Sequence, residues 1–384
     1  MSEVLLNDIC ELIVDCPHTT AVDEGHGYPL VRTPNIGKGR LVYNGMHRVS
    51  EEVYNKRNFR AVPQEDDLIF AREATAGNVA LIQKGERVCL GQRTVLLRPN
   101  KALVNPTFLT YFLLAPKQQY NLLCTANGAT VAHVNMSTIR NLKLELPHLQ
   151  IQNKIGIILS RYDSLIENYQ KQIKLLEESA QRLYKEWFID FRFPGHENTK
   201  IVDGVPEGWE KANLGTLVEF KRGKTITKKE VVEGNIPVVA GGLEPAYYCN
   251  KFNTSERVIT ISASGANAGY TKMYFEKVWA SDCSFTDNSM TPYLHFIFCF
   301  LRDNKTTLDN MQKGSAQPHV YAKDINAMEL CLPETSILQT FEEKVSKCFD
   351  TISSLIFQIR HLTEARDRLL PKLMSGEFNI YIND

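Results

Sequence analysis

Cationic side chains gather in two stretches of the sequence, where they could bind phosphate groups. Residues 32–60 contain only two acidic residues, Glu51 and Glu52, beside Arg32, Lys38, Arg40, His47, Arg48, Lys56, Arg57 and Arg60. The second stretch contains Lys221, Arg222, Lys224, Lys228 and Lys229. Each stretch is either a solvated surface loop or a nucleic-acid contact that neutralises phosphates and releases counterions. The candidate DNA contacts here are Arg32, Asn35, Lys38, Arg40, Arg48, Lys221, Arg222, Lys224 and Thr225.

A loop that ends in histidine and valine occurs twice. Residues 127–134, Asn-Gly-Ala-Thr-Val-Ala-His-Val, recur as residues 313–320, Lys-Gly-Ser-Ala-Gln-Pro-His-Val. The loop could read bases, or it could be a turn that both copies need, and the sequence favours neither. Metal binding is the weaker interpretation, because no second ligand stands nearby at suitable spacing. The candidate contacts in these loops and in the glycine-rich loop 264–269 are Thr130, His133, Gln317, His319 and Asn267.

The sequence Asn105-Pro106-Thr107-Phe108 is one residue away from the Asn-Pro-Pro-Phe/Tyr signature of adenine methyltransferases. Its second copy reads Thr291-Pro292-Tyr293, and both are better explained as helix starts, with Asn or Thr as N-cap and Pro at the first helical position. The stretch 223–225, Gly-Lys-Thr, resembles the end of a P-loop, but Val218 occupies the upstream glycine position, which excludes nucleotide binding there.

Without a complete catalytic set, the sequence favours a chain that binds and positions while partners supply chemistry. Two alternatives stay open. A DNA adenine methyltransferase-like enzyme centred on Asn105 would bind S-adenosylmethionine by itself. A structural coiled-coil scaffold would show no preference for DNA.

Residues 147–193 predict one long amphipathic helix. Apolar residues recur at steps of four and three with a single stutter, and neither glycine nor proline follows Gly156 within this stretch. The predicted seam consists of Ile151, Ile155, Ile158, Tyr162, Leu165, Tyr169, Ile173, Leu176, Ala180, Leu183 and Trp187. Roughly 38 residues would form a rod of about 57 Å that needs a partner helix to cover its apolar stripe.

A second heptad-like run, residues 337–373, is that partner, and the two runs are copies. Seven pairs share an offset of 186: Gly128 and Gly314, His133 and His319, Ile139 and Ile325, Leu144 and Leu330, Pro147 and Pro333, Ile173 and Ile359, and Leu183 and Leu369. Near the start of each copy the offset is 208, as for Leu6 and Leu214. The chain is therefore a tandem duplication whose first copy carries 22 additional residues, 208 minus 186, between Pro29 and Asn105.

Four serial segments follow: a globule at 1–146, a helix at 147–193, a linker and second globule at 194–332, and a second helix with a C-terminal tail at 333–384. Strand-like stretches stand at 30–31, 67–71, 94–97 and 258–261. The second helix can pair along the first only by running back, so the helices should be antiparallel. The expected fold class is α+β, with two mixed α/β globules and two long antiparallel coiled-coil helices.

Composition predicts an ordinary soluble protein. Of the 384 residues 43% are hydrophobic and 23% charged, which suffices for two or three cored domains. A formal net charge of zero argues against a generally basic nucleic-acid binder, although local basic faces remain compatible with it. Nine cysteines without CxxC spacing favour a reducing, cytoplasmic compartment. We expect neither a secretion signal nor a membrane segment.

Several short motifs recur in a distinctive order. Asp15-Cys16-Pro17-His18 and residues 32–36, Arg-Thr-Pro-Asn-Ile, lie in the first globule, and residues 206–210, Pro-Glu-Gly-Trp-Glu, open the second. Leu-Pro pairs at 146–147 and 332–333 precede the helices, which end at Trp-Phe-Ile-Asp-Phe, 187–191, and Leu-Leu-Pro-Lys-Leu-Met-Ser-Gly-Glu, 369–377. This order resembles the specificity subunits of type I restriction-modification systems along essentially the whole chain. One departure is that the first globule lacks the Pro-x-Gly-Trp entrance of the second.

The resemblance implies a non-catalytic subunit whose globules are target recognition domains, each reading one half of an asymmetric bipartite site on double-stranded DNA. The helices would set the spacing between the half-sites and dock two modification subunits, and restriction subunits would complete the complex. S-adenosylmethionine, ATP and Mg²⁺ would then belong to the partners, so this chain needs no cofactor or metal. The implied partner-binding residues are Leu183, Trp187, Phe188, Leu369 and Leu373.

Overall fold

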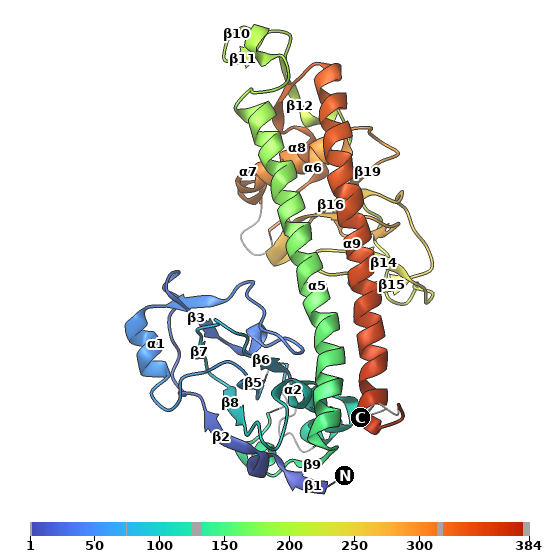
Figure 1. Ribbon diagram of the computed structural model, residues 1–384. Coiled ribbons are helices and arrows are strands. Elements are labelled where there is room, and N and C mark those ends of the chain that lie inside the picture. The colour runs from blue at the N-terminus through green and yellow to red at the C-terminus, as the bar shows by residue number, and fades with distance from the viewer. Residues whose placement is uncertain (1, 74, 125–132, 313–317, 379–384) are drawn as a thin grey trace. The chain divides into compact units, whose positions relative to one another are not determined.

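The computed structural model describes residues 2–73, 75–124, 133–312 and 318–378. The chain forms two compact units: unit 1 comprises residues 1–168 with 359–384, and unit 2 comprises residues 169–358. Each unit therefore contains one globule and part of each long helix, so the units cut across the four serial segments predicted above (Figure 1).

Unit 1 contains three small sheets, with strand orders β2-β8-β5-β6, β4-β3-β7 and β1-β9. Its strands are β1 (Ser2–Leu5), β2 (Cys10–Asp15), β3 (Tyr28–Val31), β4 (His47–Val49), β5 (Leu68–Ala71), β6 (Val79–Leu81), β7 (Cys89–Leu90), β8 (Thr94–Pro99) and β9 (Lys143–Leu146). Neighbouring strands are antiparallel except for β3 and β7, which are parallel. The strands predicted around 30–31, 67–71 and 94–97 are confirmed as β3, β5 and β8.

Unit 2 repeats this topology, with orders β13-β19-β16-β17, β15-β14-β18 and β12-β20 and an additional pair β10-β11. The strands are β10 (Ile201–Val202), β11 (Val205–Pro206), β12 (Glu210–Asn213), β13 (Lys221–Arg222), β14 (Ile236–Val239), β15 (Tyr247–Cys249), β16 (Val258–Ser262), β17 (Thr271–Tyr274), β18 (Trp279–Ala280), β19 (Cys283–Asp287) and β20 (Glu329–Leu332). The parallel pair also recurs, as β14 with β18. The predicted duplication is therefore confirmed strand by strand.

The short helices repeat as well. Unit 1 contains α1 (Glu51–Arg57), α2 (Pro106–Leu114), α3 (Pro116–Leu123) and α4 (Met136–Arg140), and unit 2 contains α6 (Leu294–Asp303), α7 (Lys305–Asn310) and α8 (Ala322–Asn326). Single 3-10 turns occur at Leu6–Ile9, Thr33–Asn35, His196–Asn198, Leu214–Thr216 and Gly265–Asn267. Most of the additional residues of the first copy lie in two connections, 32–46 against 240–246 and 50–67 against 250–257; the second of these contains α1.

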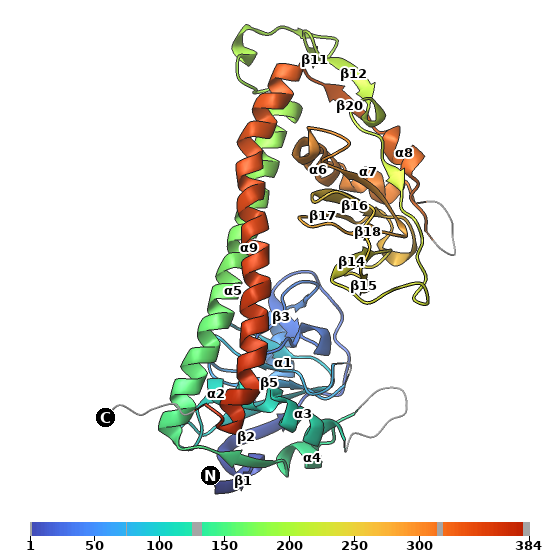
Figure 2. The ribbon, with the colours of Figure 1, turned by 90° about the vertical axis from the view of Figure 1, so that its right-hand side faces the viewer.

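The two long helices are α5 (Leu149–Tyr184), continued by a π-helical turn at Lys185–Ile189, and α9 (Thr335–Ser375). Within each unit their segments run side by side in opposite directions, as predicted (Figures 1 and 2). Gly156 allows a close approach to α5, because a Cβ there would lie 3.0 Å from Asn105 Oδ1 and 3.2 Å from the Phe108 nitrogen, closer than most Cβ contacts. The start of α2 therefore packs directly on the α5 backbone.

The predicted seam of α5 is correct in unit 2 and at Ile151, Ile155 and Ile158 of unit 1, but it departs from the structure farther along unit 1. In unit 2, Ala180 and Trp187 are buried and Ile173, Leu176 and Leu183 pack on the same core. In unit 1 the buried positions are Gln152, Ile155, Leu159, Asp163 and Ile166, whereas the predicted seam residue Leu165 is 37% exposed. The sequence pattern missed this shift because a carboxylate, Asp163, occupies a core position.

Asp163 joins three elements of unit 1. Its side chain is 4% exposed, and it accepts hydrogen bonds from Tyr111 Oη of α2 at 2.5 Å and from Arg366 Nη1 of α9 at 2.6 Å. Burial and the adjacent carboxylate raise the pKa of Tyr111, so its hydroxyl remains a donor. Beside this cluster, Arg40 Nε donates to Glu167 Oε1 at 2.7 Å, and Gly39 (φ +100°) approaches Asp163 closely. The globule is thereby fixed to both long helices.

In unit 2 aromatic side chains pack at the end of α5. Trp187 and Phe188 are each 5% exposed, and both pack against Phe341 of α9, with ring centroids 5.8 and 5.0 Å apart. Among the described residues, no helix is long and apolar enough to cross a membrane. All nine cysteines lie in described segments and are free thiols.

Candidate nucleic-acid interface

At one edge of the four-stranded sheet in unit 1, three chain segments meet at what we call the corner of the unit. The N–H of Cys16, just after β2, donates to the Thr94 carbonyl at 3.2 Å. The N–H of Arg72, just after β5, donates to the Arg93 carbonyl at 2.9 Å. The N–H of Val134, at the end of the histidine loop, donates to the Arg72 carbonyl at 3.0 Å. The end of the loop is thus attached to the sheet.

The corner of unit 2 has the same three backbone hydrogen bonds. Gly223 donates to the Cys283 carbonyl at 2.8 Å, Ala263 donates to the Asp282 carbonyl at 3.3 Å, and Val320 donates to the Ala263 carbonyl at 3.0 Å. The corners are therefore equivalent position by position. The His-Val ends of the two loops are attached to the sheet in the same way, which supports a structural role for this part of the loops.

Every charged side chain at the corner of unit 1 is paired within the corner. Arg72 Nη1 contacts both carboxylate oxygens of Asp15, at 3.0 and 2.9 Å, and Nη2 lies 2.9 Å from His133 Nε2. His133 Nδ1 lies 2.6 Å from one oxygen of Glu73, whose other oxygen contacts Arg93 Nε at 2.8 Å. The side chains form a chain of alternating partners from Asp15 to Arg93.

This arrangement fixes the hydrogen atom on the His133 ring. A guanidinium can only donate, so His133 Nε2 must accept from Arg72 and Nδ1 must carry the proton that it donates to Glu73. Both ring nitrogens are therefore engaged inside the protein. His133, predicted as a DNA contact, serves in this structure to hold the loop.

The corner of unit 2 is more loosely paired. Arg222 Nη2 is 3.7 Å from Asp282 Oδ1, its side chain is 64% exposed, and Ser264 Oγ donates to Asp282. His319 forms a β-bridge with Ser264 and stacks on Tyr321 with centroids 6.0 Å apart. Within the described part of the chain, the His319 ring nitrogens have no hydrogen-bonding partner. His319 and Arg222 therefore keep donors and acceptors free for a ligand.

The equivalent positions of the two corners carry opposite charges. Cys16 matches Gly223 through its hydrogen bond, so the preceding residues Asp15 and Arg222 are equivalent. In the same way Arg93 of unit 1 matches Asp282 of unit 2. Where unit 1 has the acid Asp15 unit 2 has a base, and where unit 1 has the base Arg93 unit 2 has an acid. The two corners should therefore prefer different polar groups in a ligand.

Two of the predicted contacts in unit 1 serve the fold instead. Asn35 is 1% exposed, and its amide accepts from the Arg32 N–H at 3.2 Å and donates to the Val42 carbonyl at 3.1 Å. Arg40 Nε donates to the carboxylate of Glu167 in α5. Both side chains make their hydrogen bonds within the protein, because the turn at Thr33–Asn35 requires Asn35 and the packing of the globule on α5 uses Arg40.

The remaining predicted cations of unit 1 differ in how free they are. Lys38 is exposed, and no contact of its ammonium lies within the described residues. Arg32 Nη2 donates to the Gly45 carbonyl at 3.1 Å and Arg48 Nη1 donates to the Gly27 carbonyl at 2.8 Å, so both retain other N–H groups. Arg57 of the same basic stretch is buried and donates to the Leu90 carbonyl at 2.6 Å.

The backbone of the predicted basic stretch in unit 2 is hydrogen-bonded to neighbouring segments, and its side chains face the solvent. The N–H of Lys224 donates to the Ala280 carbonyl at 2.9 Å, and the Lys224 carbonyl accepts from the Trp279 indole at 2.7 Å. The side chains of Lys221, Arg222, Lys224 and Thr225 are exposed. Asn267 is half-buried, and its amide donates weakly to the Gly241 carbonyl at 3.4 Å. The predicted contacts Thr130 and Gln317 lie outside the described residues.

The predicted partner-binding residues are mostly interior. Trp187, Phe188 and Leu373 are each 5% exposed, and Leu183 and Leu369 pack partly buried against the cores. In this structure Trp187, Phe188 and Leu373 close the cores around the helix ends, and partner binding at these residues stays a prediction.

Asn105 is a structural residue. Its Oδ1 accepts from the Phe108 N–H at 2.8 Å as the N-cap of α2, and its Nδ2 donates to Asn153 of α5 at 2.8 Å. The prediction of a helix start is confirmed here. It is wrong for Thr291, because α6 begins only at Leu294. The first free N–H groups of α6, those of His295 and Phe296, donate instead to the Glu342 carboxylate at 3.0 and 3.1 Å.

Sequence reasoning missed four side chains of the corners: Arg72, Glu73, Arg93 and Asp282. A usable signal was present, since each stands immediately beside an apolar strand, after β5 or before β8 and β19. Within the described segments no group of three or more His, Cys, Asp or Glu residues is placed to hold a metal ion.

Comparison with known proteins agrees with this duplicated arrangement. The model of the type I restriction modification DNA specificity domain matches residues 1–178 and again 206–361. The type I restriction enzyme MjaIX specificity subunit of Methanocaldococcus jannaschii is 27% identical over 404 residues, covering 98% of this chain and 93% of that protein. The HindI specificity subunit of Haemophilus influenzae is 24% identical, covering 74% and 80%.

A solved structure shares the fold. The crystal structure of a type I restriction-modification system S subunit from M. genitalium superposes with a TM-score of 0.59 at 16% identity, covering 97% of this chain and 95% of that one. Both matched copies of the family model contain a corner, and together they span most of the sequence. The chain belongs to the type I restriction-modification DNA specificity family.

Proposed function

We propose that this chain is the sequence-reading subunit of a type I restriction-modification complex. Each globule reads one half of an asymmetric bipartite site on double-stranded DNA, and the long helices set the spacing between the halves. Two modification subunits and the restriction subunits supply methyl transfer and cleavage. S-adenosylmethionine, ATP and Mg²⁺ bind to those subunits, and the complex works in the cytoplasm.

The exchanged charges of the two corners carry this proposal. Arg93 and Arg222, with side chains 59% and 64% exposed, stand at exchanged positions of a common backbone frame, where the other copy has Asp282 and Asp15. Such an exchange is what two readers of different sequences require. Base edges in the major groove differ in their order of donors and acceptors, so an acid and a base at exchanged positions favour different base pairs. Exposed cations such as Lys38 and Lys224 are available for phosphates, which position the protein without reading sequence.

We expect that exchanging the globule 1–146 for that of a relative changes one half-site and leaves the other unchanged. The exchanged segment must supply a tyrosine equivalent to Tyr111, because this residue bonds the globule to the buried Asp163 of α5. The measurement is single-molecule sequencing of methylated DNA from cells that carry the modification subunit. The matched control exchanges residues 194–332, which should change the other half-site. A change in both halves after one exchange would refute modular reading.

The second candidate, a methyltransferase centred on Asn105, is disfavoured because that amide is already engaged with Phe108 and Asn153. We expect the pure chain to transfer no methyl groups from S-adenosylmethionine to DNA, to cleave no DNA and to hydrolyse no ATP. Methylation should begin when modification subunits are added, and cleavage when restriction subunits are added as well. Turnover by the pure chain, unchanged in an Asn105→Ala variant, would point to a catalytic site elsewhere in it.

A further inference from the structure

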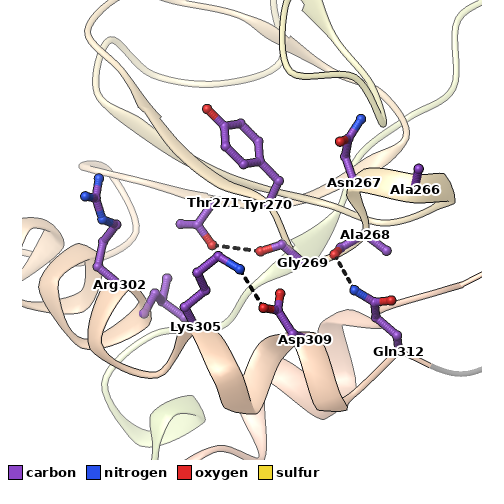
Figure 3. A pocket seen from close by; sticks show the side chains of 11 residues that line it. Ala266, Asn267, Ala268, Gly269, Tyr270, Thr271, Arg302, Lys305, Asp309 and Gln312 are labelled. Carbon is purple, nitrogen blue, oxygen red and sulfur yellow. Dashed lines mark hydrogen bonds and ion pairs between the residues drawn. The ribbon is translucent and has the colours of Figure 1, made fainter. Parts of the chain in front are cut away.

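Unit 2 contains a cavity of about 590 Å³ under its glycine-rich loop (Figure 3). The loop 265–269 and the start of β17 form one wall, and the end of α6 with α7 forms the other. Arg302, Lys305, Asn267 and Tyr270 bring polar groups to its rim (Figure 3). Its volume falls in the range of ligand sites, about 300 to 1,000 Å³.

The loop above this cavity has an equivalent in unit 1. In unit 2 the N–H of Gly269 donates to the Ser262 carbonyl and the N–H of Ser262 donates to the Tyr270 carbonyl, both at 2.9 Å. In unit 1 the N–H of Gly77 donates to the Ala71 carbonyl and the N–H of Ala71 to the Asn78 carbonyl, again both at 2.9 Å. Both glycines have positive φ, +83° and +91°. The two loops therefore have the same hydrogen-bonding frame.

In unit 1 a glutamine side chain fills the space below this loop. Gln119 Nε2 donates to the Gly77 carbonyl at 2.8 Å and to the Leu113 carbonyl at 2.7 Å. At the offset of 186 the residue equivalent to Gln119 is Lys305, and the buried leucines three residues on, Leu122 and Leu308, confirm this alignment. Among the described residues, Gln119 thus occupies in unit 1 the position that borders the open cavity in unit 2.

Unit 2 therefore has a lysine, Lys305, at the edge of the cavity where unit 1 has the neutral Gln119. The Lys305 ammonium donates to Asp309 Oδ2 at 2.5 Å and makes no bond to the loop. In unit 2 the loop is bonded by Gln312 instead, whose Nε2 donates to the Ala268 carbonyl at 3.0 Å. Arg302, whose equivalent in unit 1 is Pro116, lies 3.4 Å from Glu177 Oε2. The Lys305 and Arg302 side chains are 72% and 47% exposed, and ion pairs at such positions contribute little, so both cations can exchange their carboxylates for a stronger anion.

We infer that this cavity binds a phosphate group of the DNA backbone, with Lys305 and Arg302 as its cationic contacts and Asn267 and Tyr270 as neutral donors. Lysine, arginine, asparagine and tyrosine are the side chains that commonly hold DNA phosphates. The inference rests on the proposed function and makes the two units unequal, because unit 1 has a glutamine and a proline where unit 2 has the two cations. The contact stabilises binding on any sequence.

The test measures how binding of the full chain to a mixed-sequence DNA duplex depends on salt. Each phosphate contact contributes about 0.9 to the slope of log K against log salt, so Lys305→Gln should reduce the slope by about 0.9 and Lys305→Gln with Arg302→Gln by about twice that. Lys174→Gln is the matched control, since Lys174 is also an exposed lysine of unit 2 paired with a carboxylate four residues on, Glu178. It should leave the slope unchanged.

The outcomes separate this inference from the proposed function. If the wild-type chain binds DNA and Lys305→Gln retains its slope, the phosphate site is refuted while the sequence-reading role stands. If the wild-type chain, alone and with modification subunits, binds no DNA, the proposed function fails first. Calorimetric titration with inorganic phosphate and with ATP distinguishes the source of the phosphate. A Lys305-dependent binding of either, with an unchanged slope on DNA, would overturn the assignment to the DNA backbone.

Discussion

Replacing Asp163 by alanine is expected to destabilise unit 1 by about 3–5 kcal/mol, the usual cost of removing one partner of a buried charge pair. The substitution would leave Arg366 with only the half-exposed carboxylate of Asp367 as its partner, and Tyr111 without an acceptor. In the native protein burial opposes the charge of Arg366, and the hydrogen bonds to Asp163 and Asp367 raise its pKa. An arginine keeps its proton inside proteins, so in the variant the guanidinium cannot escape the cost by becoming neutral.

The measurement is denaturant unfolding combined with hydrogen exchange resolved by segment, because the loss should be confined to residues 1–168 and 359–378. Glu167→Ala provides the control. Glu167 lies one helical turn after Asp163, its carboxylate is 37% exposed, and it pairs with Arg40. Its loss should lower the free energy of unfolding by about 0–1 kcal/mol. Equal effects of the two substitutions would show that the Asp163 cluster does not hold the unit together.

Inserting seven residues into each long helix is expected to lengthen the unread spacer of the DNA site by about three base pairs. A heptad preserves the apolar seam and adds about 10.5 Å of helix, and base pairs stack about 3.4 Å apart. Suitable points are after Gln170 in α5 and near Ile356 in α9, because both lie close to the boundary between the two compact units.

Methylation mapping in cells that also express the modification subunits gives the spacer directly. The control inserts a single residue at each point, which turns the following helix by about 100° and should abolish methylation by breaking the seam. An active heptad-extended protein with its original spacer would refute the helices as the element that sets spacing.

The sequence alone predicted the duplication, the antiparallel helices and the strands β3, β5, β8 and β16, because these depend on apolar periodicity and on repeated residues. It placed the seam of α5 wrongly at Leu165, since a pattern of apolar residues cannot reveal that Asp163 is buried once Tyr111 and Arg366 satisfy it. The sequence does not reveal that Trp187 and Phe188 are core residues for a related reason: the aromatic residues that they pack against, Phe296 and Phe341, are distant in the sequence.

The candidate site was less predictable than the fold. The number of cations in each stretch gave Arg40 and Arg57 the same weight as Lys224 as possible phosphate contacts. In the structure Arg40 donates to Glu167, and Arg57 donates to backbone carbonyls such as that of Leu90. The side chains of the corners come from segments as far apart as Asp15 and His133, so only the folded chain shows that Arg72 links them. The base contacts themselves stay a prediction.

The division of the chain into units also bears on how the protein is made. Unit 2 is one continuous stretch, residues 169–358, whereas unit 1 needs residues from both ends of the chain. Leu373 is 5% exposed in the core of unit 1, and Arg366 neutralises its buried Asp163, so this core cannot close until the last part of α9 has left the ribosome. During synthesis the N-terminal globule, although translated first, must therefore complete its fold last, and its exposed stripe on α5 is where we expect a chaperone to bind the nascent chain.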